Sequence, residues 1–404
     1  NQVTDGTWVA GPIAKIDTVR RKIYFYGYGR EKEIDPYYYI LYEAQLDRSN
    51  TLRLLTSENA SHEVSISPSC RYLVDSYSTV SQEPVNVVRN RNGKVIMTLE
   101  KPDLQPVYEM GWKAPERFKV KAADGVTDLY GVMWKPADFD STKVYPIISN
   151  VYPGPFFEYV PTRFTINDVY NTRLAQLGFI VITVGHRGGT PMRGKAYHTY
   201  GYNNMRDYPL ADDKYAIEQL AARYPFIDAT KVGIYGHSGG GFMSAAAICT
   251  YPDFYSAAVS SAGNHDNRIY NKGFVEIHFG VDEKVKTTRD SLGVESTMYD
   301  YSVRVRPNQE LVKNYKHGLL LFTGAMDKTV NPANTLRLVD ALIKADKDFE
   351  MFVLPKCTHG FFGESEDFFE HKMWRHFARL LLHNNSADSD VDLNKDMIKD
   401  DRRR

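Results

Sequence analysis

The chain has 404 residues, and its 50 Lys and Arg residues balance 50 Asp and Glu residues, so its formal net charge is zero. This balance gives no electrostatic reason to expect nucleic acid as a partner, and no apolar run is long enough for a membrane span. The cysteines, Cys70, Cys249 and Cys357, are too few and too scattered for a disulfide framework or a metal cluster, so we expect neither metal nor cofactor.

Residues 1–103 alternate short strand-like runs with turns. Strand candidates cover residues 22–29, 37–44, 51–56 and 62–67. A spacing of about 8–12 residues between strands is typical of all-β architecture. The pattern predicts two successive four-stranded units, which are too few to close a propeller of at least about four blades. They form either a small cap or the last two blades of a larger propeller.

Residues 104–383 follow a different pattern, in which apolar runs alternate with helical segments. The helical segments include residues 207–224 and 333–346. The predicted strands lie at residues 130–134, 145–152, 178–184, 231–236, 255–260, 318–323 and 349–354. This alternation predicts a doubly wound, mostly parallel sheet of the α/β class. Residues 384–404 are predicted to be a charged, solvated C-terminal tail.

The sequence Gly236-His237-Ser238-Gly239-Gly240 lies between a predicted strand and a predicted helix. A serine in this position sits on a sharp turn that pushes its hydroxyl out over the edge of the sheet. Glycines on both sides let strand and helix approach closely, and the helix N-terminus favours a developing negative charge. The segment is therefore predicted to be the nucleophile elbow of an α/β hydrolase, with Ser238 as the nucleophile.

A serine nucleophile needs a base and an acid that orients the base, and α/β hydrolases place them in the chain order Ser, Asp, His. Asp327 follows the apolar run at 318–323, and His359 follows the run at 349–354. Both residues thus follow the carboxyl ends of strands, which is where active sites lie in parallel α/β sheets. The sequence predicts a Ser238, Asp327 and His359 triad, and it disfavours Cys357 as a rival nucleophile.

The oxyanion hole requires two hydrogen-bond donors. One is expected from the backbone N–H of Gly239, directly after the nucleophile. The other should come from the loop after an early strand, residues 151–155, but its prolines lack N–H groups. The Tyr152 hydroxyl is therefore the predicted second donor.

With these motifs in place, the chain resembles the prolyl oligopeptidase clan of serine peptidases, and within it the dipeptidyl peptidase IV branch. The resemblance runs from about Gly6 to Leu382. It is carried by Asn150-Val151-Tyr152-Pro153-Gly154-Pro155, Gly236-His237-Ser238-Gly239-Gly240, Gly324-Ala325-Met326-Asp327 with Val330, and Thr358-His359-Gly360. It implies an α/β hydrolase capped by a β-propeller, of which residues 1–103 are the terminal blades, and hydrolysis two residues in from a free N-terminus.

The resemblance also implies a substrate pocket. Tyr270, Phe274 and Val330 match walls of the family pocket for the penultimate residue of the substrate. His237 stands where the family has tryptophan, and the region of His265 should hold the pocket tryptophan. We include both histidines among the substrate-binding residues. These departures leave open whether proline or alanine is preferred.

Two function classes remain open at this point. A serine peptidase that releases Xaa-Pro or Xaa-Ala dipeptides is favoured, since a propeller cap filters peptides. A carboxylesterase, or a related acyl hydrolase or oligopeptidase on the same fold, is the alternative. The expected partner is a peptide substrate, and pairing through the closing helix, residues 366–382, predicts a homodimer. A chain that begins at Asn1 is expected to be a processed product or a fragment, with a periplasmic or secreted location.

Overall fold

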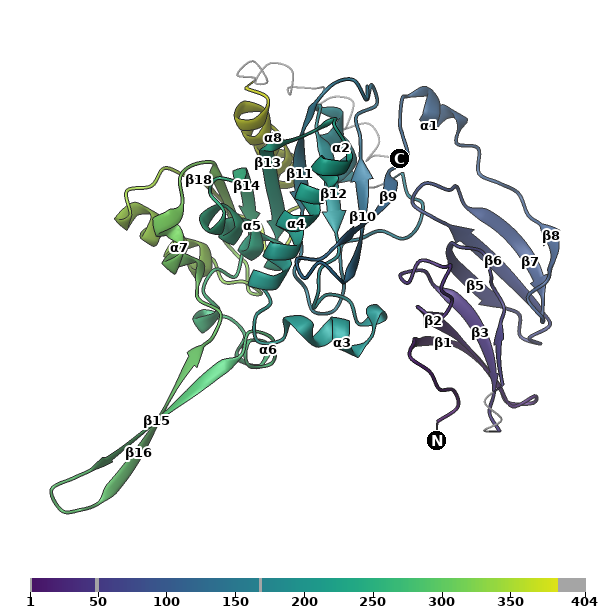
Figure 1. Ribbon diagram of the computed structural model, residues 1–404, viewed down its shortest axis with the longest axis horizontal. Coiled ribbons are helices and arrows are strands. Elements are labelled where there is room, and N and C mark those ends of the chain that lie inside the picture. The colour runs from purple at the N-terminus through teal and green to yellow at the C-terminus, as the bar shows by residue number, and fades with distance from the viewer. Residues whose placement is uncertain (1, 48–50, 167–168, 384–404) are drawn as a thin grey trace.

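A computed structural model describes residues 2–47, 51–166 and 169–383, so the predicted tail at 384–404 lies outside the described residues. The chain begins with two four-stranded antiparallel sheets (Figure 1). The first contains β1 (Val9–Asp17), β2 (Lys22–Tyr28), β3 (Ile40–Gln45) and β4 (Leu52–Leu54). The second contains β5 (Ser61–Ile66), β6 (Tyr72–Ser78), β7 (Val85–Asn90) and β8 (Val95–Thr98). These are the two predicted four-stranded units, each ordered as a meander.

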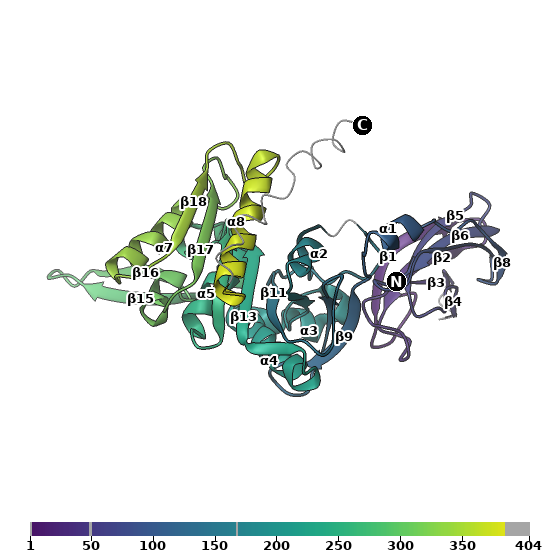
Figure 2. The same cartoon turned by 90° about the horizontal axis from the view of Figure 1, so that it is seen from above.

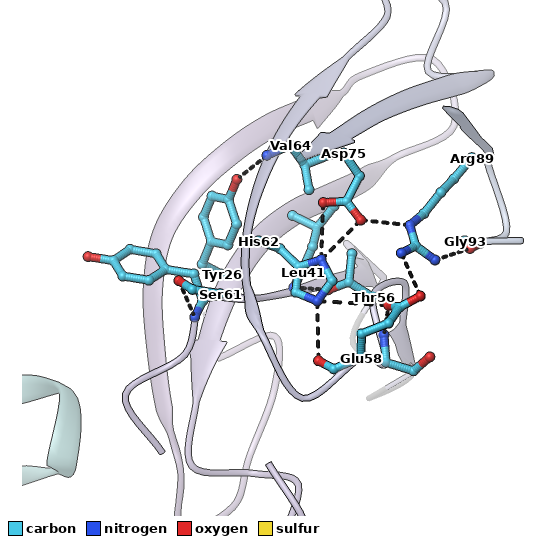
Figure 3. Close-up of polar contacts among 12 residues, drawn as sticks. Tyr26, Leu41, Thr56, Glu58, Ser61, His62, Val64, Asp75, Arg89 and Gly93 are labelled. Carbon is cyan, nitrogen blue, oxygen red and sulfur yellow. Dashed lines mark hydrogen bonds and ion pairs between the residues drawn. The ribbon is translucent and has the colours of Figure 1, made fainter. Parts of the chain in front are cut away.

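A buried network of charged groups, shown in Figure 3, ties the strands of the second sheet to the turn before it. Asp75 is fully buried and contacts His62 Nδ1 at 3.0 Å and Arg89 Nε at 2.8 Å. The Arg89 guanidinium also reaches Glu58 at 2.8 Å and donates to the carbonyl of Gly93 at 3.0 Å. Because each buried charge meets an opposite charge or a hydrogen-bond partner, the network fixes how β5, β6 and β7 sit together.

The second part of the chain is built on an eight-stranded sheet in the order β18-β17-β14-β13-β11-β12-β10-β9. Neighbouring strands from β12 to β18 run parallel, whereas β9 and β10 pair antiparallel at one edge. The strands are β9 (Glu116–Lys121), β10 (Asp128–Trp134), β11 (Tyr145–Asn150), β12 (Ile180–Val184), β13 (Ile227–His237), β14 (Tyr255–Ser261), β17 (Leu319–Gly324) and β18 (Glu350–Leu354). The predicted doubly wound, mostly parallel sheet is confirmed.

Helices cover both faces of this sheet, and each face has its own apolar core. On one face, α4 (Asp207–Arg223), α5 (Gly239–Thr250) and α7 (Ala333–Lys344) contribute buried side chains. On the other face lie α2 (Val169–Gln176) and α8 (Glu364–Leu381). Phe369, Trp374 and Phe377 of α8 are buried against the sheet. Three short helices, α1 (Gln105–Glu109), α3 (Lys195–His198) and α6 (Lys272–His278), lie in the connections.

A β-hairpin projects from the body of the α/β part (Figures 1 and 2), and no strand was expected there from the sequence. It consists of β15 (Val281–Arg289) and β16 (Glu295–Val303), paired from Val281 with Val303 to Arg289 with Glu295. Its side chains are mostly exposed, so it lacks the buried apolar run by which the core strands were predicted.

The two N-terminal sheets lie beside the β9 edge of the large sheet (Figures 1 and 2). Ion pairs join the two parts: Arg117 contacts Asp35 at 2.8 Å, and Arg163 contacts Glu63 at 2.6 Å. The predicted domain boundary, between residues 103 and 104, lies in the connection between β8, which ends at Thr98, and α1.

Candidate active site

Ser238 lies between the end of β13 and the start of α5, on a strained turn. Its backbone has φ 58° and ψ −120°, a conformation that L-residues other than glycine rarely adopt. The Ser238 N–H donates to the Ser261 carbonyl at 2.8 Å, and its own carbonyl accepts from the Phe242 N–H at 3.0 Å. These bonds to β14 and α5 hold the strained residue in place, so the hydroxyl projects from the carboxyl edge of the sheet.

His359 lies between Ser238 and Asp327. Its Nε2 is 3.0 Å from Ser238 Oγ, and its Nδ1 is 2.8 Å from Asp327 Oδ2. Asp327 is 3% exposed, and its other oxygen accepts the backbone N–H groups of Thr329 and Val330 at 2.8 and 2.9 Å. A carboxylate in this position requires the proton of His359 on Nδ1, which leaves Nε2 free to accept the serine proton. The three residues predicted from chain order therefore form one hydrogen-bonded line.

Tyr152 follows the end of β11 and lies on the other side of Ser238. Burial raises the pKa of its hydroxyl, and a hydrogen bond with Ser238 acts in the opposite direction. The hydroxyl is thus neutral at ordinary pH and is a proton donor beside the nucleophile. The backbone of Gly239, the first residue of α5, lies close to the Tyr152 ring, since a Cβ at Gly239 would be 3.8 Å from Tyr152 Cε2. Tyr152 and the backbone of Gly239 therefore lie together beside Ser238, as the predicted oxyanion hole requires.

A small pocket opens next to Ser238, with a volume of about 70 Å³. Tyr270 and Phe274, two of the predicted wall residues, line it together with Tyr152 and Gly239. The sequence did not single out several other lining residues: Met205, Phe242, Phe279, Asn264 and Phe156. Phe242 lies one helical turn after Ser238 on α5, a spacing that could have indicated it, whereas Met205 comes from a connection without a recognisable signal. Aromatic side chains make up about half of the lining residues.

The structure does not bring the other predicted substrate-binding residues into this pocket. Val330 is 2% exposed and reaches the site through its backbone N–H bond to Asp327. His265 is completely buried below the site, where Asn308 Nδ2 donates to its Nδ1 at 3.0 Å. Burial lowers the pKa of His265 to about 3, so this side chain is a neutral part of the interior. Its placement among the substrate-binding residues, which rested on the family resemblance, does not match this burial.

His237 contacts the triad at His359 and does not line the aromatic pocket. Its ring packs on the His359 ring at a centroid distance of 4.8 Å, and its Nδ1 is 2.9 Å from Ser261 Oγ. Burial, with the nearby His359, lowers the pKa of His237 to about 4. His237 also lines a second cavity of about 320 Å³ with Tyr235 and Phe361. It therefore contacts the predicted base and not the aromatic pocket.

No group of three or more His, Cys, Asp or Glu side chains among the described residues is arranged to hold a metal ion. Likewise, none of the helices in the described ranges has the length and apolar character needed to cross a membrane.

Comparison with known proteins identifies relatives of both parts of the chain. Human dipeptidyl peptidase 8 is 26% identical over 377 residues, which cover 88% of this chain and 39% of the relative. Porphyromonas gingivalis dipeptidyl peptidase 4 has a crystal structure that superposes with a TM-score of 0.77 at 20% identity, covering 94% of this chain and 51% of that one. A Bacteroides ovatus protein of known structure gives a TM-score of 0.78 at 24% identity, covering 94% and 51%.

The chain thus spans about two fifths of the length of its curated relative and about half of each superposed structure. The N-terminal region of dipeptidyl peptidase IV matches residues 1–84, which confirms the predicted branch and fits a propeller-like N-terminal part. The prolyl oligopeptidase family matches residues 167–383, more than half of the chain and the part that holds Ser238, Asp327 and His359. This chain belongs to the prolyl oligopeptidase family.

Proposed function

We propose that the protein is a serine peptidase that releases dipeptides from the free N-termini of peptides. The observation that carries this proposal is the continuous line of hydrogen bonds from Asp327 through His359 to Ser238, at 2.8 and 3.0 Å. The names of the relatives, dipeptidyl peptidase 8 and dipeptidyl peptidase 4, support the peptide substrate and the length of the product.

In the proposed reaction, Ser238 Oγ attacks the carbonyl carbon of the scissile bond while His359 Nε2 takes the hydroxyl proton. The carbonyl oxygen becomes an oxyanion between the Tyr152 hydroxyl and the Gly239 N–H. His359 then gives its proton to the nitrogen of the departing amine, the C–N bond breaks, and an acyl-enzyme remains. Water, deprotonated by His359, attacks this ester, and the serine regains its proton as the dipeptide leaves. Asp327 keeps the imidazole in one tautomer throughout and stabilises its protonated form.

The aromatic pocket beside Ser238 supports a small apolar residue at the penultimate position of the substrate. Tyr270 and Phe274 meet edge to face at 5.7 Å, and Phe274 lies 5.9 Å from Phe279. A pocket of about 70 Å³ between such rings suits proline or alanine and disfavours long or charged side chains. We therefore propose Xaa-Pro and Xaa-Ala termini as the substrates.

A panel of chromogenic dipeptide amides tests this proposal. The panel contains Xaa-Pro and Xaa-Ala amides, the same compounds with a blocked N-terminus, and a short-chain ester, each assayed with the wild-type protein and with Ser238→Ala. We expect cleavage of the free amides alone, with no turnover by the variant. Hydrolysis of the ester without any amide cleavage would instead identify an acyl hydrolase.

We also propose a homodimer and a periplasmic or secreted location. Sedimentation of the purified protein tests the first proposal, and fractionation of cells that express it tests the second.

A further inference from the structure

The position of the Tyr152 side chain depends on the loop that follows it. The ring stacks on Phe157 at 5.1 Å with an angle of 10° between planes, and it meets the edge of Tyr159 at 5.0 Å. Phe157 and Tyr159 are themselves 44% and 53% exposed, so the protein core does not hold them. The loop is instead held by polar contacts: Thr183 Oγ1 of β12 donates to the Tyr159 carbonyl at 3.0 Å, and the Glu158 side chain makes several more.

Glu158 lies between these two aromatic residues, and its carboxylate is bound from several sides. Its Oε2 accepts the Tyr37 hydroxyl at 2.5 Å, and its Oε1 accepts the Tyr197 hydroxyl at 2.9 Å. The backbone N–H groups of His186 and Thr190 lie 3.4 and 3.3 Å from Oε1. A carboxylate with this many donors is held in one orientation, and it holds the backbone of its loop in turn.

The connection after β12 leaves room for this carboxylate at two glycines. A Cβ at Gly185 would lie 2.5 Å from Glu158 Oε2, and one at Gly189 would lie 2.1 Å from Oε1. Side chains at either position would therefore expel the carboxylate. Arg193 adds positive charge nearby, with its guanidinium 5.4 Å from the Tyr37 ring and 4.6 Å from the Tyr197 ring.

One of the donors to Glu158, Tyr37, comes from the N-terminal part of the chain. It lies between β2 and β3 and precedes Glu158 by 121 residues. Its side chain is 3% exposed and packs between Tyr130 and the Arg117 guanidinium of the α/β part. The hydroxyl of a residue in the N-terminal part thus reaches the loop that carries the proposed oxyanion donor.

We propose that Glu158 is a positioning residue for the oxyanion hole, which holds the Tyr152 hydroxyl beside Ser238 and is anchored by Tyr37 of the N-terminal part. The inference rests on the proposed function, since it concerns the oxyanion step of that reaction. It gives the N-terminal sheets a part in catalysis beside any role in filtering substrates. A change at Glu158 should act on the transition state, where the oxyanion exists, and should alter kcat more than KM.

A double-mutant cycle tests whether Glu158 acts through Tyr152. Glu158→Gln keeps the size of the side chain but turns one acceptor oxygen into a donor that faces other donors. We expect Glu158→Gln to lower kcat about 10-fold with KM changed less than about 2-fold, which is less than the full loss of an oxyanion donor. In a Tyr152→Phe background the same change should lower kcat no further. Equal losses in both backgrounds, or an effect on KM alone, would overturn the proposal.

Glu63→Gln is the matched control, since it breaks the 2.6 Å ion pair between Glu63 and Arg163 without touching Glu158. It is expected to leave kcat unchanged. A second cycle combines Tyr37→Phe with Glu158→Gln and measures the free energy of unfolding in urea. It reports the coupling between Tyr37 and Glu158 and needs no substrate. We expect the two changes to be strongly non-additive, because they alter the two partners of one hydrogen bond, and additivity would overturn the role of Tyr37.

If the wild-type protein cleaved no peptide amide, the proposed substrate class would fail, and the first cycle would be run on the rate at which an organophosphorus reagent labels Ser238. A loss of labelling in Glu158→Gln that vanishes in the Tyr152→Phe background would then support the positioning role independently. Equal losses in both backgrounds, or no labelling of the wild-type protein, would overturn it.

Discussion

The carbonyl oxygen of Val151 packs directly against the backbone of Gly240. A Cβ at Gly240 would lie 2.1 Å from this oxygen, and a Cβ at Gly236 would lie 2.5 Å from it. Tyr152 follows Val151, and Ser238 lies midway between the two glycines. This contact between the end of β11 and the turn after β13 therefore sets the distance between the proposed nucleophile and the proposed oxyanion donor.

Gly240→Ala should destabilise the protein and reduce its activity together. The added methyl group must push Val151 and the elbow apart, and overpacking of this kind costs about 1–3 kcal/mol. Urea unfolding and amide hydrolysis measure the two effects. Gly273→Ala is the control, because a Cβ there has no neighbour nearer than 3.7 Å, and it should leave both properties close to wild type. Equal stabilities of the two variants would contradict the close-packing argument.

Asp327→Asn should reduce kcat by about 10⁴-fold without unfolding the protein. The amide still fits the buried site, but it no longer requires the proton of His359 to sit on Nδ1, so the imidazole loses the tautomer that accepts the serine proton. Steady-state kinetics with a dipeptide amide provide the measurement, and thermal unfolding verifies the fold. A loss smaller than about 10-fold would show that Asp327 does not orient the base.

Tyr152→Phe should lower kcat by about 10²–10³-fold and leave KM nearly unchanged, since the hydroxyl acts on the oxyanion and the ring remains in place. Tyr159→Phe is a matched control in the same loop, because it keeps the ring that packs on Tyr152 and removes only the Tyr159 hydroxyl. If both variants lost the same activity, the effect would come from the loop and not from the donor.

The buried His265 should make the protein sensitive to acid. Burial lowers the pKa of His265 to about 3 in the folded state, below the ordinary histidine value of 6.5. Between these two pH values His265 is therefore protonated in the unfolded chain but neutral in the folded protein. The favourable contribution of neutral His265 is present above pH 6.5 and is lost as the pH falls toward 3. Urea unfolding of wild type and His265→Gln at pH 7.5 and 4.5 tests this expectation. The difference in free energy of unfolding between wild type and His265→Gln should be smaller at pH 4.5, by up to about 1.4 kcal/mol per pH unit. The same difference at both pH values would contradict this role of His265.

The sheet and the triad could be predicted because their signals are local. Most strands of the large sheet are apolar runs, and Ser238, Asp327 and His359 each lie within five residues of the end of such a run. The edge strand β9 (Glu116–Lys121) alternates charged and apolar residues and was not predicted. Hairpin β15–β16 has no such run, because its pairing depends on the facing strand and most of its side chains are exposed.

The pocket was predicted less completely, because its shape depends on residues far apart in the sequence. His265 lies five residues before Tyr270, yet Asn308, 43 residues further along the chain, bonds to it in the interior. Met205 joins the pocket from the connection before α4. Neither relationship leaves a trace in the spacing of nearby residues.

The three members of the triad follow three different strands, and β18, which precedes His359, is an edge strand and the last strand along the described residues. Ser238 leaves the ribosome 121 residues before His359, so the growing chain carries an unactivated serine until its sheet is complete. In the reaction proposed above, Ser238 would have no general base until His359 has been synthesised and placed beside it. Folding of β18 onto the sheet would then be the step that makes the proposed nucleophile reactive.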